Sequence, residues 1–219
     1  MSCKAIIFDL DGTLLNTLKD LAFSVNTVLR QEGFSEHPVD AYRYFIGEGI
    51  DMLVQKALPP ERSAQQKLKE ITKAVKEEYS RRWSEYTRPY SGVAEMLDYF
   101  EENQVPKAIF SNKTHEFTIL TVEQLLPRWK FVSVRGIQPG VPRKPDPTGV
   151  LEIADKMKIK PEKILYLGDT NTDMQTAMAG GFYAVGALWG FRPAEELLES
   201  GARILAETPQ DVIDIFNKS

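Results

Sequence analysis

The chain contains the stretch Lys4-Ala5-Ile6-Ile7-Phe8-Asp9-Leu10-Asp11-Gly12-Thr13-Leu14, in which a short apolar run leads into two carboxylates. An apolar run of this length, with β-branched and aromatic residues, is typical of a strand buried on both faces inside a parallel sheet. Side chains alternate with a period of two along a strand, so Asp9 and Asp11 can project to the same side at its carboxyl end. Ligands of open α/β sheets bind at that end. Because unpaired buried charge is costly, we expect these acids to hold a cation.

The composition is that of an ordinary globular protein. The 219 residues are 42% hydrophobic and 26% charged, which excludes a disordered chain. The formal net charge of −4 argues against nucleic acid as a general partner. The single cysteine allows no internal disulfide, which fits a reducing compartment. No apolar run approaches the roughly 20 residues that span a bilayer, and no signal peptide is evident, so we expect a cytoplasmic protein without a membrane partner.

The pattern along the chain divides it into two parts. Between residues 16 and 88, apolar residues recur only at helical spacing, which predicts helices near 16–32, 40–58 and 63–85 and no strand. From residue 89 onward, predicted strands alternate with predicted helices, as in βαβ units. We therefore predict an α/β fold. Residues 1–15 and 89–219 form a Rossmann-like core, a parallel sheet with helices on both faces, and residues 16–88 form an inserted helical cap.

Polar side chains follow several of the predicted strands. After the first strand, strands are predicted at residues 105–110, 131–134, 164–167, 183–187 and 203–205. Ser111 and Asn112 follow the strand at 105–110, Asp169 follows the strand at 164–167, and Lys144 lies in a loop before a helix. Because the carboxyl ends of parallel strands lie along one edge of the sheet, these residues and the two acids of the first strand could form one compact site.

The residue types at this edge suit a metal ion and a phosphate. Asp9 and Asp169 offer the hard oxygen ligands that Mg²⁺ prefers. A carboxylate can also act as a nucleophile and form an aspartyl-phosphate, and a metal and Lys144 would offset its repulsion from a phosphate ester. Asp11 is placed to give a proton to the leaving oxygen and later to take one from water.

Three further residues extend this hypothesis, although each motif also has an ordinary explanation. Ser111 and Asn112 could donate hydrogen bonds to phosphoryl oxygens, and Asp173, in the first turn of the next helix, could hold metal-bound water or serve as a ligand. Taken singly, Asp11-Gly12 is a common turn, Ser111-Asn112 a helix cap, Lys144 a solvated lysine and Asp169-Thr170 an N-cap. Their ordered placement at strand ends favours a shared site.

These motifs together resemble those of haloacid-dehalogenase-superfamily phosphatases that carry a helical cap after the first strand. Phe8-Asp9-Leu10-Asp11-Gly12-Thr13-Leu14 is similar to the first family motif and Ser111-Asn112 to the second. Lys144-Pro145 is similar to the third, and Gly168-Asp169-Thr170-Asn171-Thr172-Asp173 to the fourth. The similarity covers the whole chain in order.

The resemblance implies roles for these positions. Asp9 would be the nucleophile and Asp11 the general acid and base. Asp9, Asp169 and the backbone carbonyl of Asp11 would bind Mg²⁺. The phosphate would be bound by the following residues: Thr13, Ser111, Asn112 and Lys144.

The resemblance also narrows the reaction. Family dehalogenases lack an acid at the position of Asp11, so its presence here favours phosphate-ester hydrolysis or phosphosugar mutase chemistry. Family mutases tend to have valine where this chain has Thr13. The segment Tyr44-Phe45-Ile46-Gly47-Glu48-Gly49 resembles the cap of phosphoglycolate-phosphatase-like members, whereas Asn16-Thr17 stands where many relatives have Asp-Ser.

We therefore expect a Mg²⁺-dependent phosphatase that acts on a small phosphorylated metabolite, as a monomer or weak dimer. Residues Arg43, Gly47, Glu48 and Gly49 of the cap are candidates for a specificity loop. A β-phosphoglucomutase-like mutase and a pyrophosphatase of the same superfamily remain alternatives, as does a non-catalytic phosphate-binding or receiver-like module.

Overall fold

The computed structural model describes residues 3–59 and 65–219 and divides into two compact units. The larger unit consists of Met1–Leu15 with Pro89–Ser219, and the smaller unit of Asn16–Arg88. The chain passes between the units through two short strands that pair with each other, β2 (Leu15–Asn16) and β3 (Arg88–Pro89). The prediction of no strand between residues 16 and 88 is therefore wrong at its two ends, because the outgoing and returning chains pair there.

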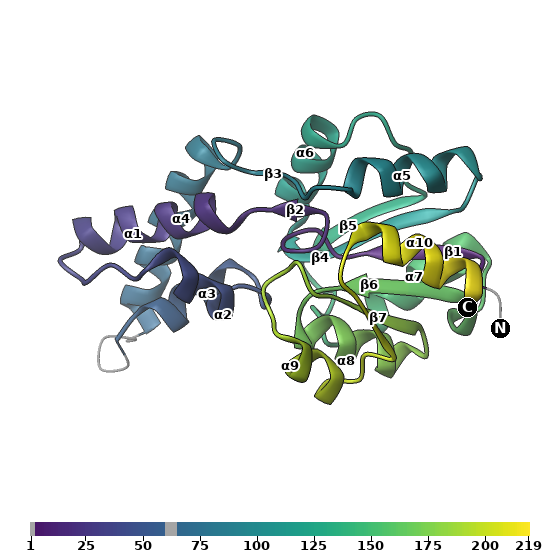
Figure 1. The fold of residues 1–219 in the computed structure, drawn as a ribbon. Coiled ribbons are helices and arrows are strands. Elements are labelled where there is room, and N and C mark those ends of the chain that lie inside the picture. The colour runs from purple at the N-terminus through teal and green to yellow at the C-terminus, as the bar shows by residue number, and fades with distance from the viewer. Residues whose placement is uncertain (1–2, 60–64) are drawn as a thin grey trace. The chain divides into compact units, whose positions relative to one another are not determined.

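The larger unit is built on a six-stranded sheet whose order is β5-β4-β1-β6-β7-β8 (Figure 1). All of its pairings are parallel. The strands are β1 (Ala5–Phe8), β4 (Lys107–Thr114), β5 (Ser133–Ile137), β6 (Ile164–Gly168), β7 (Tyr183–Ala187) and β8 (Ile204–Ala206). β1 lies between β4 and β6, so the chain order reverses at its carboxyl end, and ligands of open α/β sheets bind at such a point.

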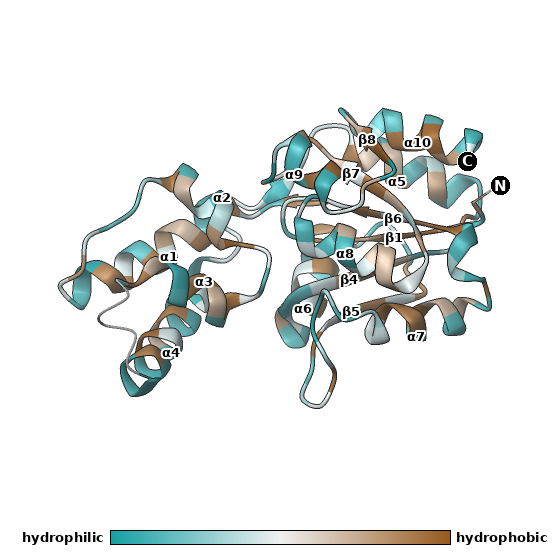
Figure 2. Ribbon diagram, turned by 90° about the horizontal axis from the view of Figure 1, so that it is seen from below, coloured by the Kyte–Doolittle hydropathy of each residue, from teal (hydrophilic) through white to brown (hydrophobic). Residues whose placement is uncertain are grey.

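Helices cover both faces of this sheet (Figure 1). Ile6 and Phe8 of β1 pack on one face with residues of α5, α6 and α10, whereas Ala5 and Ile7 pack on the other with residues of α7, α8 and α9. The helices are α5 (Val93–Glu102), α6 (His115–Leu125), α7 (Thr148–Met157), α8 (Asn171–Gly180), α9 (Ala194–Glu199) and α10 (Pro209–Lys218), with a short 3-10 helix η3 (Pro161–Lys163). Strands β1 and β6 are brown between these layers in Figure 2, as expected for strands buried on both faces. The predicted α/β fold is confirmed.

One predicted strand end is wrong in a way that matters for the site. β4 does not stop at Phe110 but runs to Thr114, so Ser111 and Asn112 lie within it. Its pairing with β5 shifts register between Phe110 and Thr114. Such an irregularity lets a strand continue while it re-aims its side chains. The N-cap of α6 is Thr114, so Ser111-Asn112 does not cap that helix.

The smaller unit is helical apart from the strand residues at its ends. Its helices are α1 (Leu18–Gln31), the 3-10 helix η1 (Val39–Ala41), α2 (Tyr42–Phe45), α3 (Ile50–Ala57) and α4 (Gln65–Arg82). Gly47 and Gly49, with φ of 128° and 88°, separate α2 from α3 in a backbone conformation that favours glycine. The predicted start of the long helix at residue 63 lies outside the described residues. In the described part of the chain, no helix is long and apolar enough to cross a membrane.

Candidate active site

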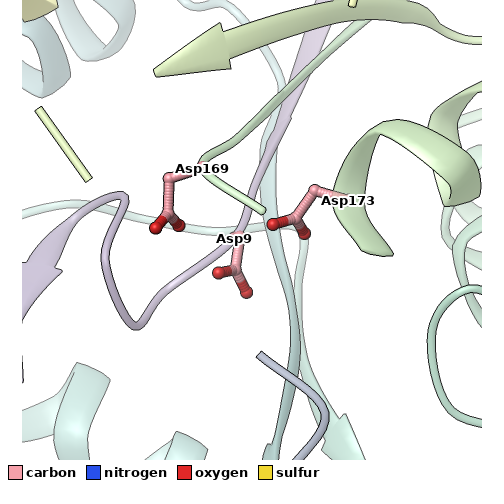
Figure 3. A group of neighbouring side chains, drawn as sticks. All are labelled: Asp9, Asp169 and Asp173. Carbon is pink, nitrogen blue, oxygen red and sulfur yellow. The ribbon is translucent and has the colours of Figure 1, made fainter. Parts of the chain in front are cut away.

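Three carboxylates come together at the carboxyl ends of β1 and β6 (Figure 3). Asp9 follows β1, Asp169 follows β6, and Asp173 lies in the first turn of α8. Each offers one oxygen, and these oxygens lie within 4.8 Å of one another. All three residues are buried, with exposed fractions of 5%, 0% and 0%. The sequence predicted that the strand ends would bring these acids together, and the structure does so.

Lys144 lies between two of these acids. Its Nζ donates to Asp9 Oδ1 at 2.7 Å and to Asp173 Oδ1 at 2.6 Å, and also to the carbonyl of Phe110 at 3.3 Å. Asn112 fixes the backbone of this lysine, since its Oδ1 accepts from Lys144 N at 2.9 Å and its Nδ2 donates to Lys144 O at 3.2 Å. A lysine that is 2% exposed is therefore a built part of the cluster and not a solvated loop residue.

Asp173 is engaged on both of its oxygens. Oδ2 accepts from the backbone N–H and the hydroxyl of Thr170, at 3.0 and 2.5 Å, and thereby closes the capping box of α8. Oδ1 accepts from Lys144 and, at 3.3 Å, from the hydroxyl of the buried Tyr166. With its acceptor capacity used in this way, Asp173 serves to orient Lys144 and is a poorer candidate for a direct metal ligand than Asp9 or Asp169.

Asp169 is held from two separate loops. The hydroxyl of Thr13 donates to Oδ1 at 2.8 Å, and the backbone N–H of Phe191 donates to Oδ2 at 2.8 Å. The structure thus places the Thr13 hydroxyl on a metal-ligand candidate, and its phosphate-binding role stays a prediction. The sequence analysis missed Phe191, although the signal was available: Trp189-Gly190-Phe191 follows β7 at the same edge of the sheet.

Asp11 forms an ion pair that the sequence analysis also missed. Lys113 Nζ lies 3.0 and 3.1 Å from the two carboxylate oxygens of Asp11. The side chains are 6% and 14% exposed, so the pair is largely shielded from water. Lys113 directly follows Ser111 and Asn112, and Ser111 is buried beside it, its hydroxyl accepting from Lys113 N at 3.2 Å. The register shift of β4 covers all three residues, which places them at this edge.

Comparison with known proteins identifies the family. A family model described as haloacid dehalogenase-like hydrolase matches residues 6–187. The chain belongs to the haloacid dehalogenase-like hydrolases. The predicted resemblance is therefore confirmed, and the chain is an enzyme of the hydrolase class.

Several proteins similar to this hydrolase are named phosphoglycolate phosphatases. The one from Nitrosospira multiformis is 28% identical over 99% of this chain and 96% of its own length. The one from Mannheimia succiniciproducens is 30% identical, with 97% of each chain covered. A Lactobacillus delbrueckii subsp. bulgaricus protein of known crystal structure, provisionally named a phosphoglycolate phosphatase, is 27% identical and superposes over 100% of both chains with a TM-score of 0.94.

The electrostatics of this hydrolase site favour a bound cation. Burial raises the pKa of Asp9 to about 7; the neighbouring Asp173 adds to this shift and Lys144 opposes it. Burial also raises the pKa of Asp169 well above its ordinary value, and Asp9 and Asp173 add to the effect. Burial lowers the pKa of Lys144, but Asp173 and Asp9 outweigh burial and hold it well above its usual range. Two closely placed acids that resist ionisation, with hard oxygen donors, fit a divalent cation such as Mg²⁺.

The four predicted cap residues lie around the Gly47–Gly49 turn of the smaller unit. Arg43 of α2 approaches Asp40 at 3.6 Å, and Glu48 pairs with Lys56 at 2.6 Å. All four belong to the smaller unit, whereas the predicted residues of the first to fourth motifs belong to the larger one. A role of the four in specificity stays a prediction.

Proposed function

We propose that this hydrolase is a Mg²⁺-dependent phosphatase that cleaves a small phosphorylated metabolite through a phosphoryl-Asp9 intermediate. The observation that carries the proposal is the buried Lys144, whose ammonium bridges Asp9 and Asp173 while Asp169 lies beside them. An acid that serves only the fold would be surrounded by donors. Asp9 instead faces two other carboxylates, an arrangement that suits binding and transfer of a charged group.

The first half of the reaction is derived from the groups around Asp9. Lys144 occupies Oδ1 of Asp9, so the other oxygen, Oδ2, is assigned the attack on phosphorus. As the new O–P bond forms, the bond to the leaving oxygen breaks, and Asp11 gives that oxygen its proton. Ser111 donates a hydrogen bond to one phosphoryl oxygen, and Lys144 donates to another in place of its 3.3 Å contact with the Phe110 carbonyl. Bound Mg²⁺, held by Asp9, Asp169 and the carbonyl of Asp11, would neutralise the negative charge of the phosphoryl group.

The second half returns the enzyme to its starting state. Water attacks the phosphorus of phosphoryl-Asp9, and Asp11, now a carboxylate, takes the proton from that water. The bond between the phosphorus and the Asp9 oxygen breaks, which releases phosphate. Lys113 keeps Asp11 in place: its ammonium contacts both oxygens of the carboxylate, and when one oxygen carries the proton the other still accepts from Lys113.

The proposed substrate is phosphoglycolate or a metabolite like it, in the cytoplasm. The names of the relatives support this, since they match over almost the full length of both chains. We assign the larger unit as the catalytic core and the smaller unit as the cap, with Arg43, Gly47, Glu48 and Gly49 as its specificity loop. We propose that the enzyme acts as a monomer or weak dimer.

Phosphate release from a panel of substrates tests the proposal. The panel contains 2-phosphoglycolate, sugar phosphates, nucleotides, pyrophosphate and p-nitrophenyl phosphate, each with Mg²⁺ and with a chelator. The proposal predicts multiple turnovers with 2-phosphoglycolate and none after chelation. Turnover that is insensitive to the chelator, or a single stoichiometric phosphorylation, would contradict it. Interconversion of a sugar phosphate without phosphate release would indicate a mutase.

A further inference from the structure

The loop that follows β7 contacts the site at two points. The backbone N–H of Phe191 donates to Asp169 Oδ2 at 2.8 Å, and the indole Nε1 of Trp189 donates to the carbonyl of Thr13 at 2.9 Å. Thr13 in turn donates its hydroxyl to Asp169 Oδ1 at 2.8 Å. The loop therefore reaches one carboxylate oxygen directly and the other through Thr13. The two carboxylate oxygens of Asp169 are held by Thr13, which is 156 positions away in the sequence, and by Phe191, which is 22 positions away.

Gly190 lets this loop come so close. A Cβ atom at Gly190 would lie 2.2 Å from Asp169 Cβ and 2.5 Å from its Oδ2. Gly12 is equally close on the first-motif loop, where a Cβ would lie 2.2 Å from the same Oδ2. Gly12 has a φ of 96°, so it is needed for its conformation as well as its size. Gly190 does not have a positive φ, so glycine is needed there only because a larger side chain would not fit.

The contacts leave Asp169 fixed but still able to bind a cation. Each carboxylate oxygen has about two acceptor sites, and the described hydrogen bonds use one on each. A carboxylate whose two oxygens are both hydrogen-bonded, and whose neighbours on two loops are glycines in close contact, cannot turn without breaking these bonds. Groups that fix a metal ligand in this way contribute to metal affinity although they never touch the metal.

We propose that Trp189–Phe191 is a positioning loop, which sets the orientation of Asp169 and thereby the affinity of the site for its divalent cation. The inference rests on the proposed function, in which Asp169 is a metal ligand. Its main consequence is that substitutions in a loop after β7 change metal binding more than they change the fold.

Two substitutions test the loop, with a third as control. Gly190→Ala introduces the Cβ that would displace Asp169, and Trp189→Phe removes only the indole N–H that holds Thr13. Trp129→Phe is the control, since it also removes an indole N–H, one that donates to Asp98 Oδ1 at 2.7 Å and not to a residue of the site. Affinity for Mn²⁺ is measured from the electron paramagnetic resonance signal of the free ion. Circular dichroism and thermal melting of the metal-free proteins report on folding.

The inference predicts a graded loss of Mn²⁺ affinity. We expect it to fall about 10- to 100-fold in Gly190→Ala and about 3-fold in Trp189→Phe, and to be unchanged in Trp129→Phe. The Mg²⁺ concentration that gives half-maximal phosphatase activity should rise by the same factors, with the KM for substrate at saturating Mg²⁺ much less affected.

Equal Mn²⁺ affinity in wild type and both loop variants would overturn the inference and leave the proposed function standing. If Gly190→Ala fails to fold, Trp189→Phe decides by itself, and unchanged affinity in that variant overturns the inference. A wild-type protein that binds no divalent cation would instead overturn the proposed function, and the inference with it.

Discussion

Both units of this chain bury carboxylates, but they surround them differently. In the smaller unit, Asp20 of α1 accepts hydrogen bonds from the backbone N–H groups of Tyr86 and Thr87 and, at 2.7 Å, from the Thr87 hydroxyl. In the larger unit, Asp9 and Asp169 lie next to one another and to Asp173. Asp20 is surrounded by donors and ties a helix to the returning chain, whereas the clustered acids repel each other. A buried acid that meets donors and no other acid thus serves the fold, whereas buried acids that also face each other favour a bound cation.

The largest expected effect is on activity. Asp9→Asn should lower kcat by at least about 10³-fold, because an amide cannot attack phosphorus. The metal-free variant should be at least as stable as wild type, since the substitution removes a charge that two neighbouring acids repel. Phosphate release and thermal melting measure the two effects. An active Asp9→Asn enzyme would refute the mechanism, and a strongly destabilised one would remove the contrast with Asp20.

Asp20→Asn should instead lower stability and leave metal binding unchanged. An amide nitrogen would face the N–H groups that now donate to the carboxylate, so the free energy of unfolding should fall by about 3 kcal/mol. Urea denaturation measures this loss. Mn²⁺ affinity serves as the matched readout and should not change. Stability equal to that of wild type would show that Asp20 does not tie α1 to the returning chain in the way its hydrogen bonds indicate.

The pH dependence of stability should report on the buried carboxyl of Asp9. The pKa of Asp9 is about 7 in the folded protein, above its value of about 4 in an unfolded chain. A raised carboxyl pKa stabilises the fold at low pH, and this contribution is lost as pH rises through about 7. Without metal, the free energy of unfolding should therefore fall by about 2–3 kcal/mol between pH 5 and pH 8 through Asp9.

This pH effect is read as the difference between wild type and Asp9→Asn in urea titrations with a chelator, so that other titrating groups cancel. Saturating Mg²⁺ should restore most of the stability at pH 8. If the free energy of unfolding changed with pH equally in the two proteins, the pKa of Asp9 would not be raised in the metal-free folded protein.

The smallest expected effect concerns the pair of Lys113 and Asp11. Lys113→Met should slow phosphoryl transfer from alkyl phosphates about 10-fold, because their leaving oxygen depends on the proton from Asp11. Transfer from p-nitrophenyl phosphate, whose leaving oxygen depends little on a donated proton, should slow far less. Rapid-quench measurement of the first turnover gives both rates. Lys113→Arg should keep the ion pair and retain most of the activity. An equal loss with both substrates would mean that Lys113 serves the fold alone.

Most of the fold and the centre of the site could be predicted from the sequence, since both depend on local patterns. Apolar runs that end in acids mark strands, and strand ends share one edge of a parallel sheet, so Asp9, Lys144 and Asp169 were predicted to meet. The placement of Ser111 inside β4 could not be predicted, because the register shift depends on pairing with β5.

Two of the contacts missed by the sequence analysis are long-range. Lys113 is 102 residues from Asp11, and Trp189 is 176 residues from Thr13. No local periodicity reports such a pair. A glycine between two aromatic residues, directly after a strand at the site's own edge, was the one available signal for the positioning loop.

The most direct test of the central claim is to identify the phosphorylated residue. The enzyme is mixed with 2-phosphoglycolate and Mg²⁺, quenched in acid within the first turnover, digested, and analysed by mass spectrometry. The account predicts a phosphoryl group on Asp9, and none when Mg²⁺ is removed by a chelator. Phosphate released in the first turnover with no phosphorylated peptide, or with the phosphoryl group on another residue, would contradict it.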